Sequence, residues 1–498
     1  MNKVKHELII LFLLIIAFSN NSISQVKFEQ ILGGTGYDYG HSVIQTKDKG
    51  YVFAGSTTSY GNGNSDVYIL KTDSLGVTLW QKTFGDINID QAYSIKETSD
   101  SGFVIAGFTN SFGYGGYDMY IMRTDKIGNV VWTKTYGGTN WDFAYSIETT
   151  SDGGYIIAGG TYSFGKGDED MYLVKINSIG DTLWTKTYGG TKEDEARSVK
   201  QTNDGGYILT GITKSQGDIN GDFYTIKTNN NGDTLWTKTI GGNGEDKANS
   251  IIQTSDGGYI TVGYSENTFA GRNDGFIVKT NSTGDTLFTR RNGAPNDCEA
   301  FDICESSDGT YVWVGKILIS GKYLVWLFKI DMGGGWQFAN MYGGSLNNIG
   351  QSLKQTTDGG YIVVANSTSF NNHLEDVYLF KTDINGISSG TIVNNATGIS
   401  DFGSPIKSGS MQIVPNPTRS GSCKLFIPSN EISTVLDCQL KIYQISGQLV
   451  SEKSYKAIPS LNGFELNIDA GKLINGLYFV ELTTSNDKYT CKLIISND

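Results

Sequence analysis

The chain has 498 residues, of which 39 are Lys or Arg and 51 are Asp or Glu, so its formal net charge is −12 at pH 7. An acidic chain of this kind repels phosphate backbones, which argues against a nucleic-acid partner. Five cysteines in a chain of this length exclude a small scaffold held together by disulfides.

Residues 1–24 have the pattern of a secretory signal peptide. Lys3 and Lys5 give a positive start, and an apolar run follows at residues 8–18. The small Ser24 precedes the predicted cut. The apolar run is shorter than the roughly 20 residues that a membrane-spanning helix needs. We therefore expect a mature chain that is soluble, has no membrane span and lies outside the cytoplasm.

Residues 25–384 consist of a repeated unit. An aromatic residue that opens a motif of the form WTKTYGG recurs with a spacing of 52 residues. Each unit contains four short runs of alternating apolar and polar residues, separated by Gly-rich or Asn-Gly turns, which predicts four β-strands. Four-stranded units with a fixed period are typical of β-propeller blades. The aromatic positions are Phe28, Trp80, Trp132, Trp184, Trp236 and Phe288, and a slightly early seventh copy has Trp336.

The order of the runs predicts how the ring closes. The first three runs of the unit occur seven times, and the last set ends near Asp383 with no fourth run after it. A run of the fourth type stands instead at the N-terminus, from Gln25 to Gly34. We therefore predict an all-β, seven-bladed propeller in which the N-terminal strand closes the last blade and removes the free edges. A linear solenoid would not need such an arrangement.

Two further recurring features are expected to be structural. The Trp series should pack outer strands against neighbouring sheets. An Asp recurs four residues before a Ser in five units, which favours a repeated hydrogen-bonded lock over five separate active sites. The pairs are Asp38 and Ser42, Asp90 and Ser94, Asp142 and Ser146, Asp194 and Ser198, and Asp246 and Ser250.

The turn and the Trp of each unit, as in NSIGDTLW, resemble the blade motif of quinoprotein-type propellers. The resemblance covers only this stretch of each unit. The eight blades and the cofactor pocket of those enzymes have no counterpart in the sequence, so the resemblance implies shared blade construction and no cofactor. The whole repeat is also similar to that of secreted propellers of the Bacteroidetes.

The composition changes after the last repeat. Residues 385–410 are rich in Gly, Ser, Asn and Thr and are predicted to form a linker. Residues 411–498 contain short alternating strands separated by turns, which predicts a small antiparallel sandwich. The sequence leaves open whether two of the three cysteines in this region pair. These cysteines are Cys423, Cys438 and Cys491.

The motifs of residues 411–498 closely resemble the type A C-terminal sorting domain of the type IX secretion system of Bacteroidetes. That resemblance implies an immunoglobulin-like sandwich and a protein that is secreted or displayed on the cell surface. It also implies two partners, the secretion machinery and a sortase-like cysteine protease that removes the domain. The matching residues are Pro415, Asn416, Pro417, Tyr443, Gly447, Gly476, Tyr478 and Lys492.

No set of residues is typical of catalytic machinery. The mature chain has two histidines, His41 and His373, at non-equivalent positions in their repeats. The sequence has no zinc-type Cys/His cluster, phosphate loop or serine-hydrolase elbow. A calcium-like stretch, GDINGD from Gly217, is better explained by a hairpin turn. We predict no catalytic residue, no metal and no cofactor, although a glycosidase pair of carboxylates stays open.

The candidate binding residues lie where the repeats differ. The position before the recurring Ser is variable and mostly large, and one such residue per blade would ring the central channel near its mouth. Aromatic and hydrogen-bonding side chains there suit a sugar or a peptide, while the alternative is a position that tolerates any residue. The ring candidates are His41, Tyr93, Tyr145, Arg197, Asn249, Phe301 and Gln351, and Trp141 lies on an adjoining loop.

These observations predict a secreted or surface-displayed propeller, expected to be a monomer, that binds a glycan or a protein without catalysis. Two alternatives stay open. One is an extracellular hydrolase or lyase that acts on polysaccharide. The other is a structural surface or adhesion component with no small ligand. The sequence does not identify the ligand.

Overall fold

In the residues that it describes, the computed structural model contains β-strands and no helix. These residues are 25–293, 295–370, 374–390, 392–395, 412–414, 422–428, 436–444, 449–460, 463–469, 476–484 and 488–495. The predicted signal peptide, residues 1–24, lies outside them. The chain divides into two compact units, Met1–Ile399 and Ser400–Asp498.

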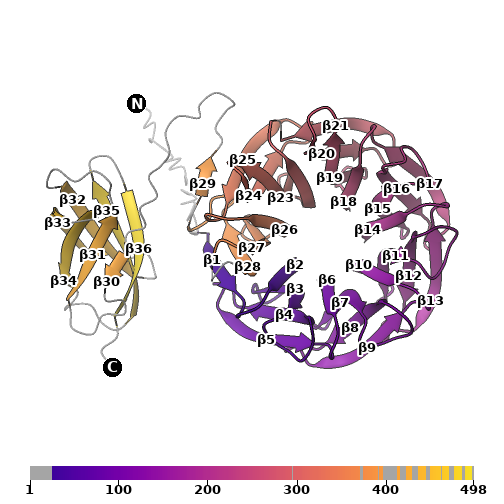
Figure 1. The fold of residues 1–498 in the computed structure, drawn as a ribbon, viewed down its shortest axis with the longest axis horizontal. Helices are drawn as coiled ribbons and strands as arrows, with labels where there is room; N and C mark the ends of the chain where they lie inside the picture. Colours follow the sequence, from indigo (N-terminus) through magenta and orange to yellow (C-terminus); the bar gives the residue numbers. More distant parts are fainter. Residues whose placement is uncertain are drawn as a thin grey trace, which may run out of the picture. The chain divides into compact units, whose positions relative to one another are not determined.

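The N-terminal unit is a seven-bladed β-propeller, as the 52-residue repeat predicts. The blades are antiparallel sheets arranged around a centre, and the first strand of each repeat lies innermost (Figure 1). Blade one comprises β2 (Asp38–Gln45), β3 (Tyr51–Thr57), β4 (Asp66–Thr72) and β5 (Thr78–Phe84), and blade two comprises β6 (Asp90–Glu97), β7 (Phe103–Thr109), β8 (Asp118–Thr124) and β9 (Val130–Tyr136). Blade three comprises β10 (Asp142–Thr149), β11 (Tyr155–Thr161), β12 (Asp170–Ile176) and β13 (Thr182–Tyr188), and blade four comprises β14 (Asp194–Gln201), β15 (Tyr207–Thr213), β16 (Asp222–Thr228) and β17 (Thr234–Ile240). Blade five comprises β18 (Asp246–Gln253), β19 (Tyr259–Asn267), β20 (Arg272–Thr280) and β21 (Thr286–Asn292), blade six comprises β22 (Cys298–Glu305), β23 (Tyr311–Ile319), β24 (Lys322–Ile330) and β25 (Trp336–Tyr342), and blade seven comprises β26 (Asn348–Gln355), β27 (Tyr361–Ser367), β28 (Asp376–Thr382) and β1 (Phe28–Leu32).

Blade seven is completed by the N-terminal strand, which confirms the predicted closure. β1 pairs antiparallel with β28 over five positions, beginning with Phe28 opposite Lys381. Gln25 adds a hydrogen bond at the same junction, because its side-chain oxygen accepts from the amide of Ile384 at 3.0 Å. The two ends of the repeat region therefore share one sheet, and the ring is joined by main-chain pairing.

The segment predicted as a linker, residues 385–410, contains a further strand. β29 (Ile392–Asn395) pairs antiparallel with β25 and adds a fifth strand to blade six. The first described part of the segment therefore belongs to the propeller sheet, and the division between the two compact units follows it at Ile399.

The C-terminal unit consists of antiparallel strands, consistent with a small sandwich. Its strand order is β30-β31-β34-β33-β32-β35-β36. β33 pairs with β32 through its first part and with β34 through its last three residues, so it links the two halves. The strands are β30 (Gln412–Val414), β31 (Ser422–Pro428), β32 (Leu436–Gln444), β33 (Leu449–Ser460), β34 (Gly463–Asp469), β35 (Gly476–Thr484) and β36 (Lys488–Ile495).

The sorting-motif residues fall partly on these strands. Tyr443 lies in β32, opposite Phe479 of β35, which in turn lies opposite Lys492 of β36. Gly476 and Tyr478 both lie in β35. The motif residues Pro415, Asn416, Pro417 and Gly447 lie outside the described residues, as do the side chains of Cys423 and Cys491, so the pairing of the cysteines stays open.

The recurring aromatic residues join neighbouring blades, as predicted, except that Phe338 and not Trp336 holds this position in blade six. Phe338 lies opposite Lys329, as Trp80 lies opposite Lys71, whereas Trp336 lies opposite Ile330 and is 49% exposed. Trp80 of β5 packs on Phe103 of blade two with ring centroids 6.0 Å apart, and Trp184 of β13 packs on Tyr207 of blade four at 5.9 Å. A turn glycine of the next blade lies against the same ring, since a Cβ on Gly128 would come within 3.0 Å of Trp80 Cζ3. Glycine therefore allows this turn to close onto the aromatic residue of the preceding blade.

The recurring Asp and Ser residues are both hydrogen-bonded, but to different partners. Asp38 holds loops around its own strand, because its Oδ2 accepts from the Ser59 hydroxyl at 2.6 Å and from the amide of Gly34 at 2.7 Å. Ser42 instead links blades, since its Oγ accepts from the amide of Ile95 at 3.3 Å. Equivalent bonds recur in the following blades. The Asp fixes the loops, and the Ser fixes neighbouring inner strands.

A buried cation on the third strand of every blade holds the first hairpin turn, a contact that the sequence analysis did not anticipate. Lys175 Nζ of β12 lies 2.9 Å from an oxygen of Asp152 in the turn between β10 and β11. Burial alone would raise the pKa of Asp152, but hydrogen bonds from Thr150 and Lys175 outweigh it and lower that pKa to about 2. The pairs are Lys71–Asp48, Arg123–Asp100, Lys175–Asp152, Lys227–Asp204, Lys279–Asp256, Lys329–Asp308 and Lys381–Asp358.

The same hairpin turns allow a test of their left-handed backbone conformation. Gly153 has φ +82°, whereas the equivalent residues Lys49 and Ser101 adopt φ +68° and +66°. A side chain in this left-handed region costs about 1–2 kcal/mol, which glycine avoids while losing about 0.5–1 kcal/mol of chain entropy on folding. We expect Lys49→Gly and Ser101→Gly each to raise the free energy of unfolding by up to about 1 kcal/mol in denaturant titrations.

The matched control is Gly153→Ala. No atom lies within 4 Å of a Cβ placed on Gly153, so this variant reports the backbone conformation alone. It should lower the free energy of unfolding by about 1 kcal/mol. An unchanged stability in all three variants would show that the left-handed turn is not maintained.

Candidate functional site

The seven candidate ring residues occupy a β-bulge in the innermost strand of each blade. The pairing of β2 with β3 passes from Gly40 to Ser42 and skips His41, and that of β6 with β7 skips Tyr93 in the same way. A bulged residue has no partner on the adjacent strand, and the bulge changes the direction of its side chain. All seven candidates line a central cavity of about 410 Å³, namely His41, Tyr93, Tyr145, Arg197, Asn249, Phe301 and Gln351. Ligand binding by them stays a prediction.

Four of these residues stack on one another around the ring. His41 stacks on Tyr93 with centroids 4.5 Å apart, and Tyr93 meets Tyr145 edge to face at 5.4 Å. The Arg197 guanidinium lies 4.1 Å from the centroid of Tyr145. Burial lowers the pKa of His41 to about 4, so its imidazole is neutral near pH 7. Because each of these side chains packs on the next, this part of the wall is fixed in place.

The other three ring residues are less tightly linked. Asn249 donates from Nδ2 to the carbonyl of Ala300 in the next blade at 2.8 Å. Phe301 has the Lys316 ammonium 5.9 Å from its ring centroid. Gln351 completes the ring on blade seven. The wall is therefore aromatic on blades one to three and polar or mixed on the remaining blades.

Trp141 is not among the residues that line the cavity and belongs to a second feature. Its side chain is 52% exposed, and its indole meets Tyr117 at 5.8 Å and Tyr162 at 6.0 Å, both edge to face. Phe143 connects Trp141 to the ring residue Tyr145, at 6.4 and 6.1 Å respectively. We call this connected set the aromatic sector; it comprises Tyr93, Phe108, Tyr117, Trp141, Phe143, Tyr145 and Tyr162.

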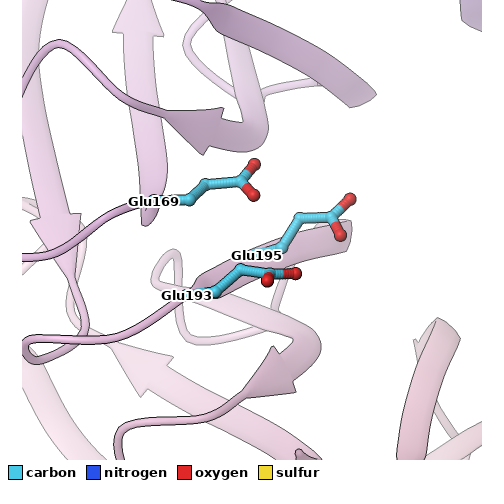
Figure 2. A group of neighbouring side chains, drawn as sticks. All are labelled: Glu169, Glu193 and Glu195. Atoms are coloured by element: carbon cyan, nitrogen blue, oxygen red, sulfur yellow. The ribbon is translucent and has the colours of Figure 1, made fainter.

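Three carboxylates gather beside the aromatic sector. Glu169 precedes β12, Glu193 lies in the loop before β14, and Glu195 lies in β14. Figure 2 shows their side chains extending in the same direction, and one oxygen from each lies within 4.8 Å of the others. The Tyr162 hydroxyl donates to Glu169 Oε2 at 3.1 Å and so joins this acidic cluster to the aromatic sector. The only sequence signal for the cluster was the acidic KGDED and TKEDE loops of the variable turns.

The members of the acidic cluster differ in charge state. Burial, followed by the charge of Glu195, raises the pKa of Glu169 to about 7. Glu195 forms ion pairs with Arg197 at 2.5 Å and Lys247 at 2.9 Å. Glu193 forms an ion pair with Lys214 at 2.8 Å. Each carboxylate therefore already has a partner in the protein, and the cluster by itself does not define a metal site.

A group of charges lies further along the inner strands, on the same cavity wall. Lys96, Lys200 and Lys354 line the cavity together with Asp302, and Glu148 lies between Lys96 and Lys200. We call these five residues the lysine tier. The sequence analysis did not single them out, although their charged side chains fall three residues after the ring position, or one residue after it for Asp302.

Residues 412–496 match the family model of a secretion system C-terminal sorting domain. The match confirms the resemblance on which the sequence analysis relied. The protein is thus a β-propeller exported to the cell surface or secreted. Its C-terminal unit is a type IX secretion system sorting domain, and the secretion machinery is the partner that this domain implies. Within the residues that the structure describes, no helix has the length and apolar character to cross a membrane.

Similarity to other proteins is low. Regulatory protein FlaEY of Caulobacter vibrioides is 24% identical over 178 residues, which cover 31% of this chain and 18% of that protein. Among solved structures, Sqt1 from Chaetomium thermophilum has TM-score 0.40 and 8% identity, covering 94% of this chain and 100% of that one. The polysaccharide lyase Uly1 has TM-score 0.43 and 11% identity, covering 72% of this chain and 95% of that one. Similarities this low say nothing of the activity of this chain.

The raised pKa of Glu169 makes stability depend on pH. The ionised form is disfavoured in the folded state, so stability should fall as pH rises from the unfolded-state value of about 4.3 through about 7. Glu169→Gln removes this penalty and keeps an acceptor for Tyr162. We expect the variant to raise the melting temperature at about pH 8 and to change it little at about pH 4.

Glu193→Gln is the control, because Glu193 is more exposed and forms an ion pair with Lys214. It should give no gain at the higher pH. Equal effects of Glu169→Gln at both pH values would contradict the proposed charge state of Glu169.

Proposed function

We propose that the exported propeller binds a glycan without catalysis, and that the aromatic sector and the acidic cluster form the site. The proposal rests above all on Trp141, which is half exposed and packs on Tyr117 and Tyr162. Sugars have apolar faces that stack on aromatic rings and hydroxyl groups that donate to carboxylates. Trp141 packs on Tyr162, whose hydroxyl donates to Glu169, so the exposed indole and the acidic cluster belong to one connected group of side chains.

In this proposal the ring residues have a supporting role. Tyr93 and Tyr145 hold the inner end of the aromatic sector through their edge-to-face contact. Arg197 contacts Tyr145 and forms an ion pair with Glu195, so it fixes the aromatic sector and the acidic cluster relative to each other. A site held in this way is preorganised, which lowers the entropy lost when a ligand binds.

A polysaccharide hydrolase is the second candidate, and one observation favours it. A carboxyl with a pKa near 7, such as Glu169, is suited to act as a general acid beside an ionised partner. Against this, Glu195 is held by Arg197 and Lys247, and Glu193 is held by Lys214. A nucleophile or base needs a carboxylate oxygen directed at the substrate, so binding without turnover is the better account.

The proposal predicts that Trp141→Ala weakens glycan binding. Loss of one stacked ring removes about 0.5–1.5 kcal/mol, which corresponds to about two- to tenfold in affinity, and the loss of buried area adds to this. The measurement is calorimetry with a glycan identified on an array, with product analysis on every hit. The melting temperature should fall only slightly, because half of the indole is exposed.

Phe164→Ala is the matched control. Phe164 is 44% exposed and packs on Tyr172 in blade three, outside the aromatic sector. It should leave the affinity unchanged. Equal affinity of the Trp141→Ala variant and the parent protein would refute the site, released product would favour the hydrolase, and no saturable glycan binding would favour a protein ligand or a structural role.

The C-terminal unit resembles sorting domains of the type IX secretion system. From this resemblance we propose that a sortase-like protease removes residues 411–498 after export. The intact mass of the secreted protein tests this directly. A mass that still includes residues 411–498 would contradict it.

A further inference from the structure

The lysine tier has two parts. In the first part, formed by Asp302 and Lys354, the charges are balanced. Asp302 stands in blade six where most other blades have the recurring Ser. It accepts from Lys354 at 2.8 Å and from the hydroxyls of Ser250 and Ser352, each at 2.9 Å. Burial alone would raise the pKa of Asp302, but Lys354, the charge of Lys200 and the Ser352 hydroxyl outweigh it and lower that pKa. Lys354 is therefore neutralised by a carboxylate with several donors.

The second part carries an excess positive charge. Glu148 lies 3.1 Å from the Lys96 ammonium and 3.2 Å from that of Lys200, so one carboxylate serves two cations. Burial, opposed by Glu148 and reinforced by Lys200 and Lys354, lowers the pKa of Lys96 to about 8. The side chains of Lys96 and Lys200 are 18% and 24% exposed, and both line the cavity. One positive charge is thus left without a partner inside a confined space.

The inner strands supply further donors to the same space. Ser42, Ser94, Ser146 and Ser198 line the cavity. Each Oγ accepts an amide N–H from the next blade at 3.2–3.3 Å. A hydroxyl that accepts in this way still has its proton to donate. Among the described residues, no acceptor is recorded for these four protons.

We propose that the lysine tier is an oxyanion-binding site, in which a sulfate, phosphate or carboxylate group binds on the cavity side of Lys96 and Lys200 and accepts hydrogen bonds from the serine hydroxyls. The excess ammonium charge supplies the attraction, and four hydroxyl donors arranged around the channel supply directed contacts. The ring residues line the same cavity. The site is independent of glycan binding at the aromatic sector.

The experiment uses the full exported protein and sodium sulfate, with calorimetry at constant ionic strength near pH 7. We expect saturable binding of sulfate, with inorganic phosphate and acetate as parallel arms that rank the oxyanions. Lys96→Met should weaken binding about tenfold or more. This variant removes the excess charge but leaves Glu148 paired with Lys200, so no buried carboxylate loses its partner.

Two further variants and a pH series test whether sulfate binds at the lysine tier itself. Glu148→Gln frees the second ammonium and should tighten binding severalfold, whereas Lys214→Met, a cation outside the cavity, should leave it unchanged. Affinity should fall between about pH 7 and about pH 9.5, because Lys96 loses its proton over this range while Glu148 and Asp302 stay ionised. Absence of saturable sulfate binding in the parent protein, or equal binding by the parent and Lys96→Met, would overturn the proposal.

Discussion

The main-chain pairing of β1 with β28 is the constraint on which the rest of the propeller depends. Seven blades form a ring only if the last one completes its sheet, and the strand that completes it comes from the other end of the repeat region. This pairing is non-local, since Phe28 lies opposite Lys381, and it joins the two ends of the seven-bladed repeat region. Once it has formed, each blade is held between two neighbours.

Contacts between blades and within them show why the ring is stiff. Between blades, the aromatic residue of the fourth strand packs on the next blade, and the recurring Ser accepts a hydrogen bond from an amide of the next inner strand. Within each blade, a buried cation anchors the hairpin turn. All three contacts use residues that repeat along the chain. The repeated residues therefore build a uniform scaffold, and the residues that differ between repeats are left to line the channel and form the variable loops.

The bulge in each inner strand connects the scaffold to the candidate site. A bulge re-aims one side chain per blade towards the channel without disturbing the hydrogen bonds on either side. The geometry is the same in every blade, yet the residue at the bulge ranges from His41 to Arg197 and Phe301. A symmetric backbone thus presents an asymmetric wall, which is aromatic on blades one to three and mixed on the remaining blades.

Sequence reasoning predicted what depends on period and order. The spacing of the Trp series predicted the blades. The strand of the fourth type at the N-terminus, Gln25–Gly34, predicted how the ring closes. The partner Ser59 of Asp38 could not be predicted, because it comes near Asp38 only through the loops of the folded blade. The acidic cluster was missed for a similar reason, since Glu169 and Glu195 lie on different blades and their proximity depends on loop conformation.

The lysine tier is a second feature that could not be predicted from the sequence. Charged residues at a position that recurs every 52 residues were visible in the sequence, but a charge on a strand normally indicates a solvated face. Only the closed ring brings Lys96, Glu148 and Lys200 to one channel, and only the distances show that a single carboxylate serves two ammonium groups. Net charge inside a cavity is a property of the assembled ring and not of any repeat.

The central claim is that ring closure holds the channel wall in place, and hydrogen–deuterium exchange tests it most directly. The comparison is between the intact protein and a variant that lacks residues 25–32, with the strands of the C-terminal unit as the internal reference. If closure is the constraint, amide exchange in β2 and β26, which flank the junction, should quicken by about tenfold or more while the C-terminal unit is unchanged. Unchanged exchange in β2 and β26 would contradict the account.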